Sequence, residues 1–406
     1  MAAGKERYRV ELALARGFKI ARTLSDAPLI AYAASSPATT PERPSNHVFV
    51  WDLAQPEPRA VLDEANSPNC PIVWHPNGRT FYRAQRQILA VDARAAKGAS
   101  AAITSFAPTS HGPVVWFLSC APDGTELLFR KESDSSTGER GVVRLVRQSL
   151  RTSETQTVPL PDGDRLWMAS VSWRARRIAA SVASRDWKDY ELRVFDFEGR
   201  VIHRCSTTDA SMGDLALNPA ISPDGSRLAI ETGRGLAVLH IGSSRWEMLG
   251  ARGREPAWSP DGARLAFVHN ARELLLCHLA DRRIQRLAYV RGRDFREPYR
   301  HGGWDEAPVW SGDGRHLWFS LTRQHRLLKP KRPDRAKFDE WFADAYKGVK
   351  VAEAQRERAW QRTIAESRYT PSHKVGVVDL VGRKVWLADE HWRNVGWAPA
   401  SGANRA

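Results

Sequence analysis

The chain has 406 residues, of which 42% are hydrophobic and 26% charged, so it can bury a sizeable core without disulfide or metal staples. This composition excludes a disordered chain as the default. The 61 Lys and Arg residues exceed the 46 Asp and Glu residues and give a formal net charge of +15, which favours an anionic partner. A solvated, arginine-rich surface without a partner is the alternative interpretation of this charge.

The N-terminal residues MAAGKERYRVELALARGFK lack the uninterrupted apolar stretch of a secretory signal, and no segment is apolar enough to span a bilayer. We therefore expect a cytoplasmic protein with no membrane partner. The four cysteines, Cys70, Cys120, Cys205 and Cys277, lack zinc-site spacing and are expected to be reduced core residues.

Strand-like runs begin with PLIAYAA (28–34) and HVFVWDLA (47–54), which we expect to be a second and a third strand. The chain then repeats a phrase in which an apolar run, a Pro/Asp/Gly turn and another apolar run follow one another. It is clearest at AISPDGSRLAIE (220–231) and PAWSPDGARLAFV (256–268). Looser copies are IVWHPNGRTFY (72–82), FLSCAPDGTELLF (117–129), SVSWRARRIAASV (170–182), APVWSGDGRHLWF (307–319) and the partial VGWAPASG (395–402). Pro, Asp and Gly favour turn conformations that reverse the chain between two strands.

The residue before each turn gives an anchor for the period of the repeat. The anchors are Trp74, Cys120, Trp173, Ile221, Trp258, Trp310 and Trp397, at spacings of 46, 53, 48, 37, 52 and 87 residues. Such spacings, with strand-sized runs between turns, are typical of four-stranded propeller blades. The sequence therefore predicts an all-β protein, a seven-bladed β-propeller formed as a single domain by residues 1–406.

The Trp-Ser-Pro-Asp-Gly phrase resembles the TolB-type propeller repeat, most closely at 220–268 and 308–320. The resemblance implies the fold. It does not imply one function, since propellers of this type include partner-binding proteins, gates of serine peptidases and a lyase group.

Ring closure has two possible sources. Trp397 lies too near the end of the sequence for a full blade, so the C-terminal segment is expected to supply the inner strand of the first blade. The alternative is that FKIARTL (18–24) supplies this strand itself.

Strand order places the Pro-Asp-Gly turns on one rim, which we call the turn rim, and the longer irregular loops on the opposite rim, which we call the insertion rim. The long final spacing indicates an insertion at residues 322–372 in the last blade, on the insertion rim. It begins with the basic run HRLLKPKRPDR and continues as a helical hairpin from about Pro333 to Ser367. Its aromatic residues, among them Trp341 and Trp360, could contact a ligand, a partner or a second copy of the chain, or could pack on the propeller.

Three histidines, His111, His301 and His391, precede inner strands on the insertion rim. Inner strands converge on the axis of a propeller, so these imidazoles could hold a divalent metal or act as acid and base. This arrangement resembles the histidine-ligated site of oligogalacturonate lyase propellers, although the ligand motifs of that family do not match residue by residue. The alternative is that these histidines only bond loop backbone.

The loop YVRGRDFREPYRHGGWDE is the richest anion-binding candidate. Arg293, Arg296 and Arg300 can hold carboxylates or phosphates bidentately, and Tyr299 can stack on a sugar or base. Glu255 and Glu306 add carboxylates near the starts of inner strands. Ion pairs within the loops are the alternative role of all these residues.

No nucleophile elbow, phosphate-binding loop or HExxH helix occurs. The sequence thus favours a scaffold that binds an anionic ligand or an acidic protein through the insertion rim. The alternative is a metal-assisted lyase or another small-molecule enzyme acting on an acidic substrate. Nucleic acid ranks third, because no module for it is recognised.

Overall fold

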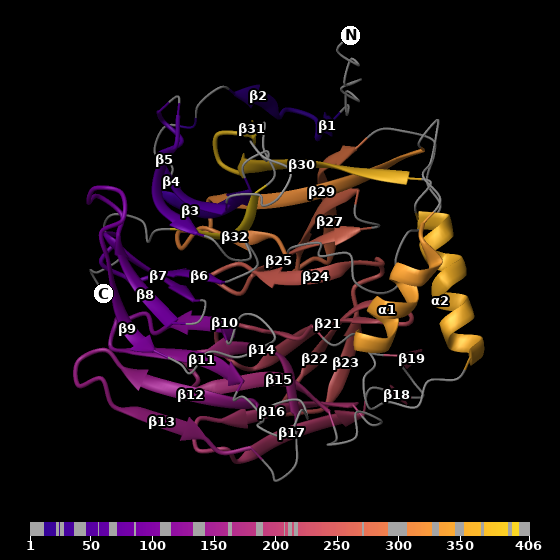
Figure 1. Cartoon of the computed structure of the whole chain (residues 1–406), viewed down its shortest axis with the longest axis horizontal. Helices are drawn as coiled ribbons and strands as arrows, with labels where there is room; N and C mark the ends of the chain where they lie inside the picture. Colours follow the sequence, from indigo (N-terminus) through magenta and orange to yellow (C-terminus); the bar gives the residue numbers. More distant parts are fainter. Residues whose placement is uncertain are drawn as a thin grey trace.

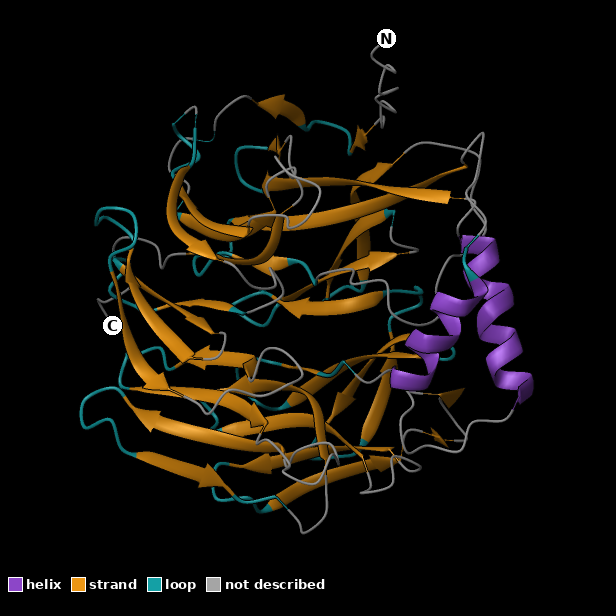
Figure 2. Cartoon of the chain, viewed as in Figure 1, coloured by secondary structure: helices purple, strands orange, loops and turns teal. Residues whose placement is uncertain are grey.

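The computed structural model describes residues 12–21, 24, 28–35, 46–55, 57–64, 71–84, 87–105, 115–132, 143–160, 165–183, 190–206, 208–209, 213–214, 218–269, 272–290, 307–326, 333–345, 353–366, 369–388 and 392–397. Its strands form seven four-stranded blades arranged as a propeller (Figures 1 and 2). The predicted fold class is confirmed.

The four strands of each blade run in order from the inner strand to the outer one. Blade 1 contains β32 (Trp392–Trp397), β3 (Ile30–Ser35), β4 (Asn46–Trp51) and β5 (Arg59–Glu64). Blade 2 contains β6 (Ile72–Trp74), β7 (Thr80–Ala84), β8 (Gln87–Asp92) and β9 (Ser100–Ser105). Blade 3 contains β10 (Val115–Cys120), β11 (Glu126–Glu132), β12 (Val143–Ser149) and β13 (Thr155–Val158). Blade 4 contains β14 (Arg165–Ser172), β15 (Arg177–Ala183), β16 (Tyr190–Asp196) and β17 (Val201–Ser206).

The remaining blades follow the same order. Blade 5 contains β20 (Ala220–Ile221), β21 (Arg227–Thr232), β22 (Gly235–His240) and β23 (Arg245–Met248), after a small hairpin of β18 (Thr208–Asp209) and β19 (Gly213–Asp214). Blade 6 contains β24 (Arg254–Trp258), β25 (Arg264–His269), β26 (Glu273–His278) and β27 (Arg283–Val290). Blade 7 contains β28 (Val309–Trp310), β29 (His316–Arg326), β30 (Tyr369–Asp379) and β31 (Lys384–Ala388), with α1 (Arg335–Ala345) and α2 (Glu353–Glu366) between β29 and β30.

The core lies between neighbouring blades, which explains why the second strand of a blade is apolar on both faces. In β21, Leu228 packs in a cluster with blade 4 residues, whereas Ala229 packs with Leu265 and Phe267 of blade 6. Each blade thus buries both faces of its sheet, and the ring is held together by repeated sheet-to-sheet packing.

The C-terminal strand closes the ring, as predicted. β32 pairs antiparallel with β3, with Trp397 opposite Ile30. The alternative inner strand from FKIARTL is wrong. Residues Lys19–Ala21 instead form β2, which runs parallel to the outermost strand of blade 7, with Lys19 opposite Lys384.

The N-terminal residues 12–21 and 24, which we call the strap, connect the last blades to the first and so close the ring a second time. The sequence carries no signal for this arrangement. β1 (Leu12–Leu14) pairs with the outer strand β27 of blade 6, and β2 follows on blade 7 before the chain enters blade 1. Leu14 and Phe18 pack against the core between blades 6 and 7, and Leu24 is buried between blades 7 and 1. Apolar side chains at spaced positions thus fasten this strap to three successive blades.

Six of the seven anchors pair with the first or second residue of the second strand of their blade, as Trp258 does with Leu265. The anchor in blade 4 was misplaced by two residues. Val171, opposite Ile178, occupies the equivalent position, and Trp173 lies in the turn, where its indole Nε1 donates to Ser119 Oγ of blade 3 at 2.8 Å.

The turns of the turn rim are tied to one another by arginines. Arg177, Arg227 and Arg264 each donate to the carbonyl of the turn glycine in the next blade, at 2.8, 2.9 and 3.0 Å. Two of these guanidinium groups also lie over tryptophan rings of the next blade, Arg227 over Trp258 and Arg264 over Trp310. The repeated Trp and Arg residues thus fasten each blade to its neighbour.

Cys120, Cys205 and Cys277 are free thiols. Burial raises the pKa of Cys120 to about 12 and that of Cys277 to about 11, which keeps both protonated. Cys70 lies outside the described residues. Neither α1 nor α2 has the length and apolar composition needed to cross a membrane.

Candidate functional site

The inner strands of the blades begin at the insertion rim. Four of these strands carry a β-bulge near that end. The bulges fall between Val115 and Leu118 in β10, Leu166 and Ala169 in β14, Arg254 and Ala257 in β24, and Arg393 and Gly396 in β32. A bulge adds one residue and redirects nearby side chains, and bulges are frequent beside functional sites.

The bulge in β24 holds Glu255 in a strained conformation. Its φ is 50°, a left-handed value that costs a residue other than glycine about 1 kcal/mol. The Glu255 carboxylate accepts a hydrogen bond of 2.5 Å from the side-chain amide of Asn218, just before β20 of blade 5. This bond fixes the orientation of the Glu255 carboxylate, which was a candidate binding residue in the sequence analysis.

A second carboxylate lies across the same pair of blades. Glu231, near the end of β21, forms an ion pair with Arg254 at 3.3 Å. Burial raises the pKa of Glu231, and the attraction of Arg254 opposes this effect. Asn218, Glu231, Arg254 and Glu255 together form what we call the blade 5–6 cluster. It places two carboxylates in different surroundings, which is an arrangement that acid–base chemistry or selective binding can use.

The helical insertion is the largest feature of this rim. The β29–β30 ladder has eleven paired positions, whereas β31 pairs with only five residues of β30. The six further pairs extend the hairpin by about 20 Å at the rise of a β-strand. α1 and α2 lie at the end of this extension, on the same side of the molecule as β18 and β19 (Figure 1).

The two helices have a core of their own. Phe338, Phe342 and Trp360 form one buried cluster, with Phe338 and Trp360 ring centroids 5.2 Å apart. Asp334 caps α1, since its carboxylate accepts a hydrogen bond from the backbone N–H of Ala336 at 2.9 Å. The hairpin is therefore a small folded unit carried by the ladder.

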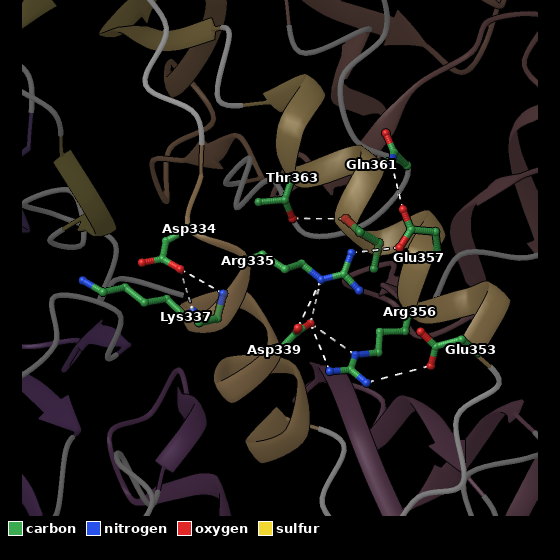
Figure 3. A network of polar contacts seen from close by, with 11 residues as sticks. Asp334, Arg335, Lys337, Asp339, Glu353, Arg356, Glu357, Gln361 and Thr363 are labelled. Carbon is green, nitrogen blue, oxygen red and sulfur yellow. Dashed lines mark hydrogen bonds and ion pairs between the residues drawn. The ribbon is translucent and has the colours of Figure 1, made fainter.

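An ion network joins the two helices (Figure 3). Arg335 of α1 contacts Asp339 at 3.1 Å and Glu357 of α2 at 2.8 Å, and Arg356 of α2 contacts Asp339 at 3.1 Å. The Arg335 guanidinium also lies over the Trp360 ring at 5.1 Å. Because these charges are partly exposed and share partners, the network orients the helices more than it stabilises them.

Two of the predicted site residues can be placed in full. Glu255 belongs to the blade 5–6 cluster. Trp360 is 6% exposed and packs between the helices, so a ligand contact by Trp360 stays a prediction. Trp341 lies in α1, but its side chain is outside the described part.

The other predicted site residues lie outside the described residues. They are His111, Arg293, Arg296, Tyr299, Arg300, His301, Glu306 and His391. Whether the three histidines converge is therefore still a prediction, as is the arginine-rich anion site. Within the described ranges no three His, Cys, Asp or Glu side chains are grouped so as to hold a metal ion.

Sequence reasoning missed Asn218 and Glu231. Glu231 had a detectable signal, because the equivalent positions of most other blades are small or aliphatic, such as Ser181 in blade 4 and Val268 in blade 6. A charged residue where the repeat places a core residue marks an exception to the pattern. Asn218 carries no such signal, since it precedes a strand in an irregular segment.

No protein-family model matches the chain, and a comparison with curated proteins finds no similar sequence. The candidate site therefore rests on its own residues.

Proposed function

We propose that this propeller is a binding scaffold that holds an acidic protein or another anionic ligand on its insertion rim, and that it works in the cytoplasm. The observation that supports this most directly is the helical hairpin, a separately packed unit carried on an extended ladder. The ring does not need such an arm for its own packing, because the aromatic cluster of the hairpin is made of hairpin residues. The TolB-type character of the repeat is part of the proposal and rests on the turn phrases.

Charge supports an anionic partner. The chain has a formal net charge of +15, and the sequence leading into α1 is HRLLKPKRPDR. Basic side chains near an arm can attract an acidic partner over a distance of about 10 Å in moderate salt. Binding of this kind weakens as salt rises, whereas an apolar interface would respond little.

Excision of the hairpin tests the proposal. Arg326 and Tyr369 are opposite each other at the end of the ladder, so an Asn-Gly turn can replace residues 327–368 and reconnect the two strands. We expect the full chain to bind labelled poly-L-glutamate in a salt-dependent manner, and the excised variant to bind it at least about tenfold more weakly.

Arg200→Ala, an exposed change on the turn rim, is the matched control and should leave binding unchanged. Retained affinity after excision, with an intact ring, would show that the arm is not the binding element. Tight binding of poly-uridylate in place of poly-L-glutamate would point to nucleic acid. A molar mass that rises with concentration in the full chain alone would indicate that the arm joins two copies.

A second candidate is small-molecule chemistry at the mouth of the ring, with a divalent metal held by His111, His301 and His391. The raised pKa of Glu231, which belongs to the same cluster as Glu255, favours it, because a carboxyl group that holds its proton more tightly is better suited to act as an acid. Metal analysis tests it. Near-stoichiometric metal that is lost in the triple alanine variant supports the enzyme, and metal-free wild-type protein contradicts the metal-assisted form.

A further inference from the structure

The outer edge of blade 7 carries a second surface, separate from the insertion rim. Ile20 of β2 is 63% exposed and Val381, in the turn before β31, is 73% exposed. They are the two most exposed of the four large hydrophobic residues that are exposed in the described ranges. Arg16 and Lys19 lie just before Ile20 in the chain, Arg383 and Lys384 lie just after Val381, and all four are exposed. Because side chains alternate along a strand, Lys19 and Lys384 share one face of the sheet edge and Ile20 lies on the other. We call these six residues the edge patch.

The strap creates this patch by bringing like charges together. Lys19 and Lys384 are directly opposite each other in the parallel pairing of β2 and β31, and the Lys19 amide donates to the Arg383 carbonyl at 3.0 Å. An added Cβ at Gly17 would lie 3.4 Å from Arg383 Nη1, so the Arg383 side chain lies along the strap. Like charges directly opposite destabilise a strand pair.

The described residues provide no counter-charge for the patch. None of its four basic side chains has a hydrogen bond or ion pair within the described ranges. The acidic residue of the same hairpin, Asp379, is buried and pairs with Arg315 at 3.1 Å. The patch is therefore positive and partly apolar, at a sheet edge where β2 is the outermost strand.

We infer that the edge patch docks an extended, acidic segment of a partner protein that also carries aliphatic side chains. Carboxylates would neutralise the Lys19–Lys384 pair and its two arginines, and aliphatic side chains would cover Ile20 and Val381. No described strand pairs with the outer edge of β2, so its peptide groups can bond to an extended backbone, as in recognition by strand addition. An anionic membrane would use the charges but not this edge. The patch also lacks the aromatic residues that are typical of membrane interfaces.

The Lys384→Glu variant separates binding from folding. A carboxylate at position 384 faces Lys19 and turns a repulsive pair into an attractive one, so the melting temperature should stay equal or rise. The probe is a short labelled peptide of alternating Glu and Ile residues, measured by fluorescence anisotropy on the full chain. We expect Lys384→Glu to weaken its binding about tenfold, since one charge is reversed. Val381→Ser should also weaken it, at unchanged stability.

Arg151→Glu is the matched control, because Arg151 is an exposed arginine in the β12–β13 turn of blade 3. An equal loss with this control, or no loss with Lys384→Glu, overturns the inference. The inference is also overturned if the wild-type chain does not bind the peptide, or if it binds phosphatidylserine vesicles instead and Lys384→Glu abolishes that binding. Excision of residues 327–368 is run in parallel. If excision abolishes peptide binding and Lys384→Glu does not, the edge patch is overturned and the proposed site on the insertion rim is supported. If Lys384→Glu weakens peptide binding and excision does not, only the edge patch is supported.

Discussion

The two rims of the propeller are built from the same strands and yet differ in what their residues do. On the turn rim, a short turn is repeated from blade to blade, and arginines bond turn carbonyls of the next blade. On the insertion rim, four of the inner strands carry a bulge, Glu255 has a left-handed conformation, and Glu231 has a raised pKa. Left-handed residues other than glycine occur on the turn rim too, as at Arg176 and Ser244, but there they lie in tight turns between strands. The difference teaches that the repeated contacts between blades are concentrated at one rim, which leaves the other able to carry irregular residues and an added arm.

The largest expected effect comes from the turn glycines. Gly225 on the turn rim has a φ of 69°, and an added Cβ would lie 2.3 Å from Ala175 Cβ of blade 4. Gly250, between β23 and β24, has a φ of 71° and open space around it. We expect Gly225→Ala to cost about 3 kcal/mol of unfolding free energy and Gly250→Ala about 1 kcal/mol. Urea unfolding measures both. Equal losses would mean that close packing between blades adds nothing at the turn rim.

Truncation of Trp360 tests whether the arm folds separately from the ring. Trp360→Ala removes the centre of the hairpin cluster and should destabilise the hairpin by about 3 kcal/mol. Hydrogen exchange should become faster in α1 and α2, with unchanged protection in blades 1 to 6. Gln361→Ala, on the exposed side of α2, is the control. Faster exchange throughout the ring would contradict an independent arm.

A smaller effect is expected for a single arginine contact between blades. Arg264 bonds the Gly314 carbonyl and lies over the Trp310 ring at 4.9 Å, so Arg264→Ala should cost about 2 kcal/mol. Arg200, whose side chain is 80% exposed, is the matched control and should cost less than about 0.5 kcal/mol when changed to Ala. If the two variants melt alike, the arginine contacts between blades do not hold the ring together.

Sequence reasoning reached the fold because its signal is repeated. The turn phrase occurs in several blades, and each copy specifies a local reversal of the chain that depends on nearby residues only. Closure of the ring by β32 could be predicted by counting strands, because the first blade lacked an inner strand and the C-terminal segment had one to spare. The strap could not be predicted in this way, because β1 and β2 have three residues each and pair with strands more than 250 positions away. Short segments of this kind acquire structure from the edge that they join.

The candidate site was less predictable for a related reason. Glu255 was found because it lies near the start of an inner strand, but its bulge and its bond to Asn218 depend on two blades meeting. The shift of Trp173 into its turn likewise follows from an irregular copy, SWRARR, in which no proline fixes the turn. Repetition reveals the common structure of the blades, whereas function lies in departures from it.

Two glutamates, one at each rim, allow the comparison to be tested by pH. Glu231 has a pKa raised above its usual 4.5, so the folded state holds this proton more tightly than the unfolded state, and stability falls as pH rises through this range. On the turn rim, burial opposes ionisation of Glu247, but a hydrogen bond from His240 and the charges of Arg282 and Arg245 outweigh it and lower its pKa. Its contribution is present at neutral pH and is lost as pH falls below 4.5.

Replacement of each glutamate by glutamine should therefore act in opposite directions. Relative to wild type, Glu231→Gln should gain stability as pH rises from acid to neutral, whereas Glu247→Gln should lose it over the same range. Arg254→Ala should make the pH dependence due to Glu231 steeper, since it removes the charge that favours ionisation. Urea unfolding at a series of pH values measures all three. If the two glutamine variants change in the same direction, the Glu231 carboxylate does not oppose folding, and the contrast between a stabilising carboxylate on the turn rim and a destabilising one on the insertion rim is contradicted.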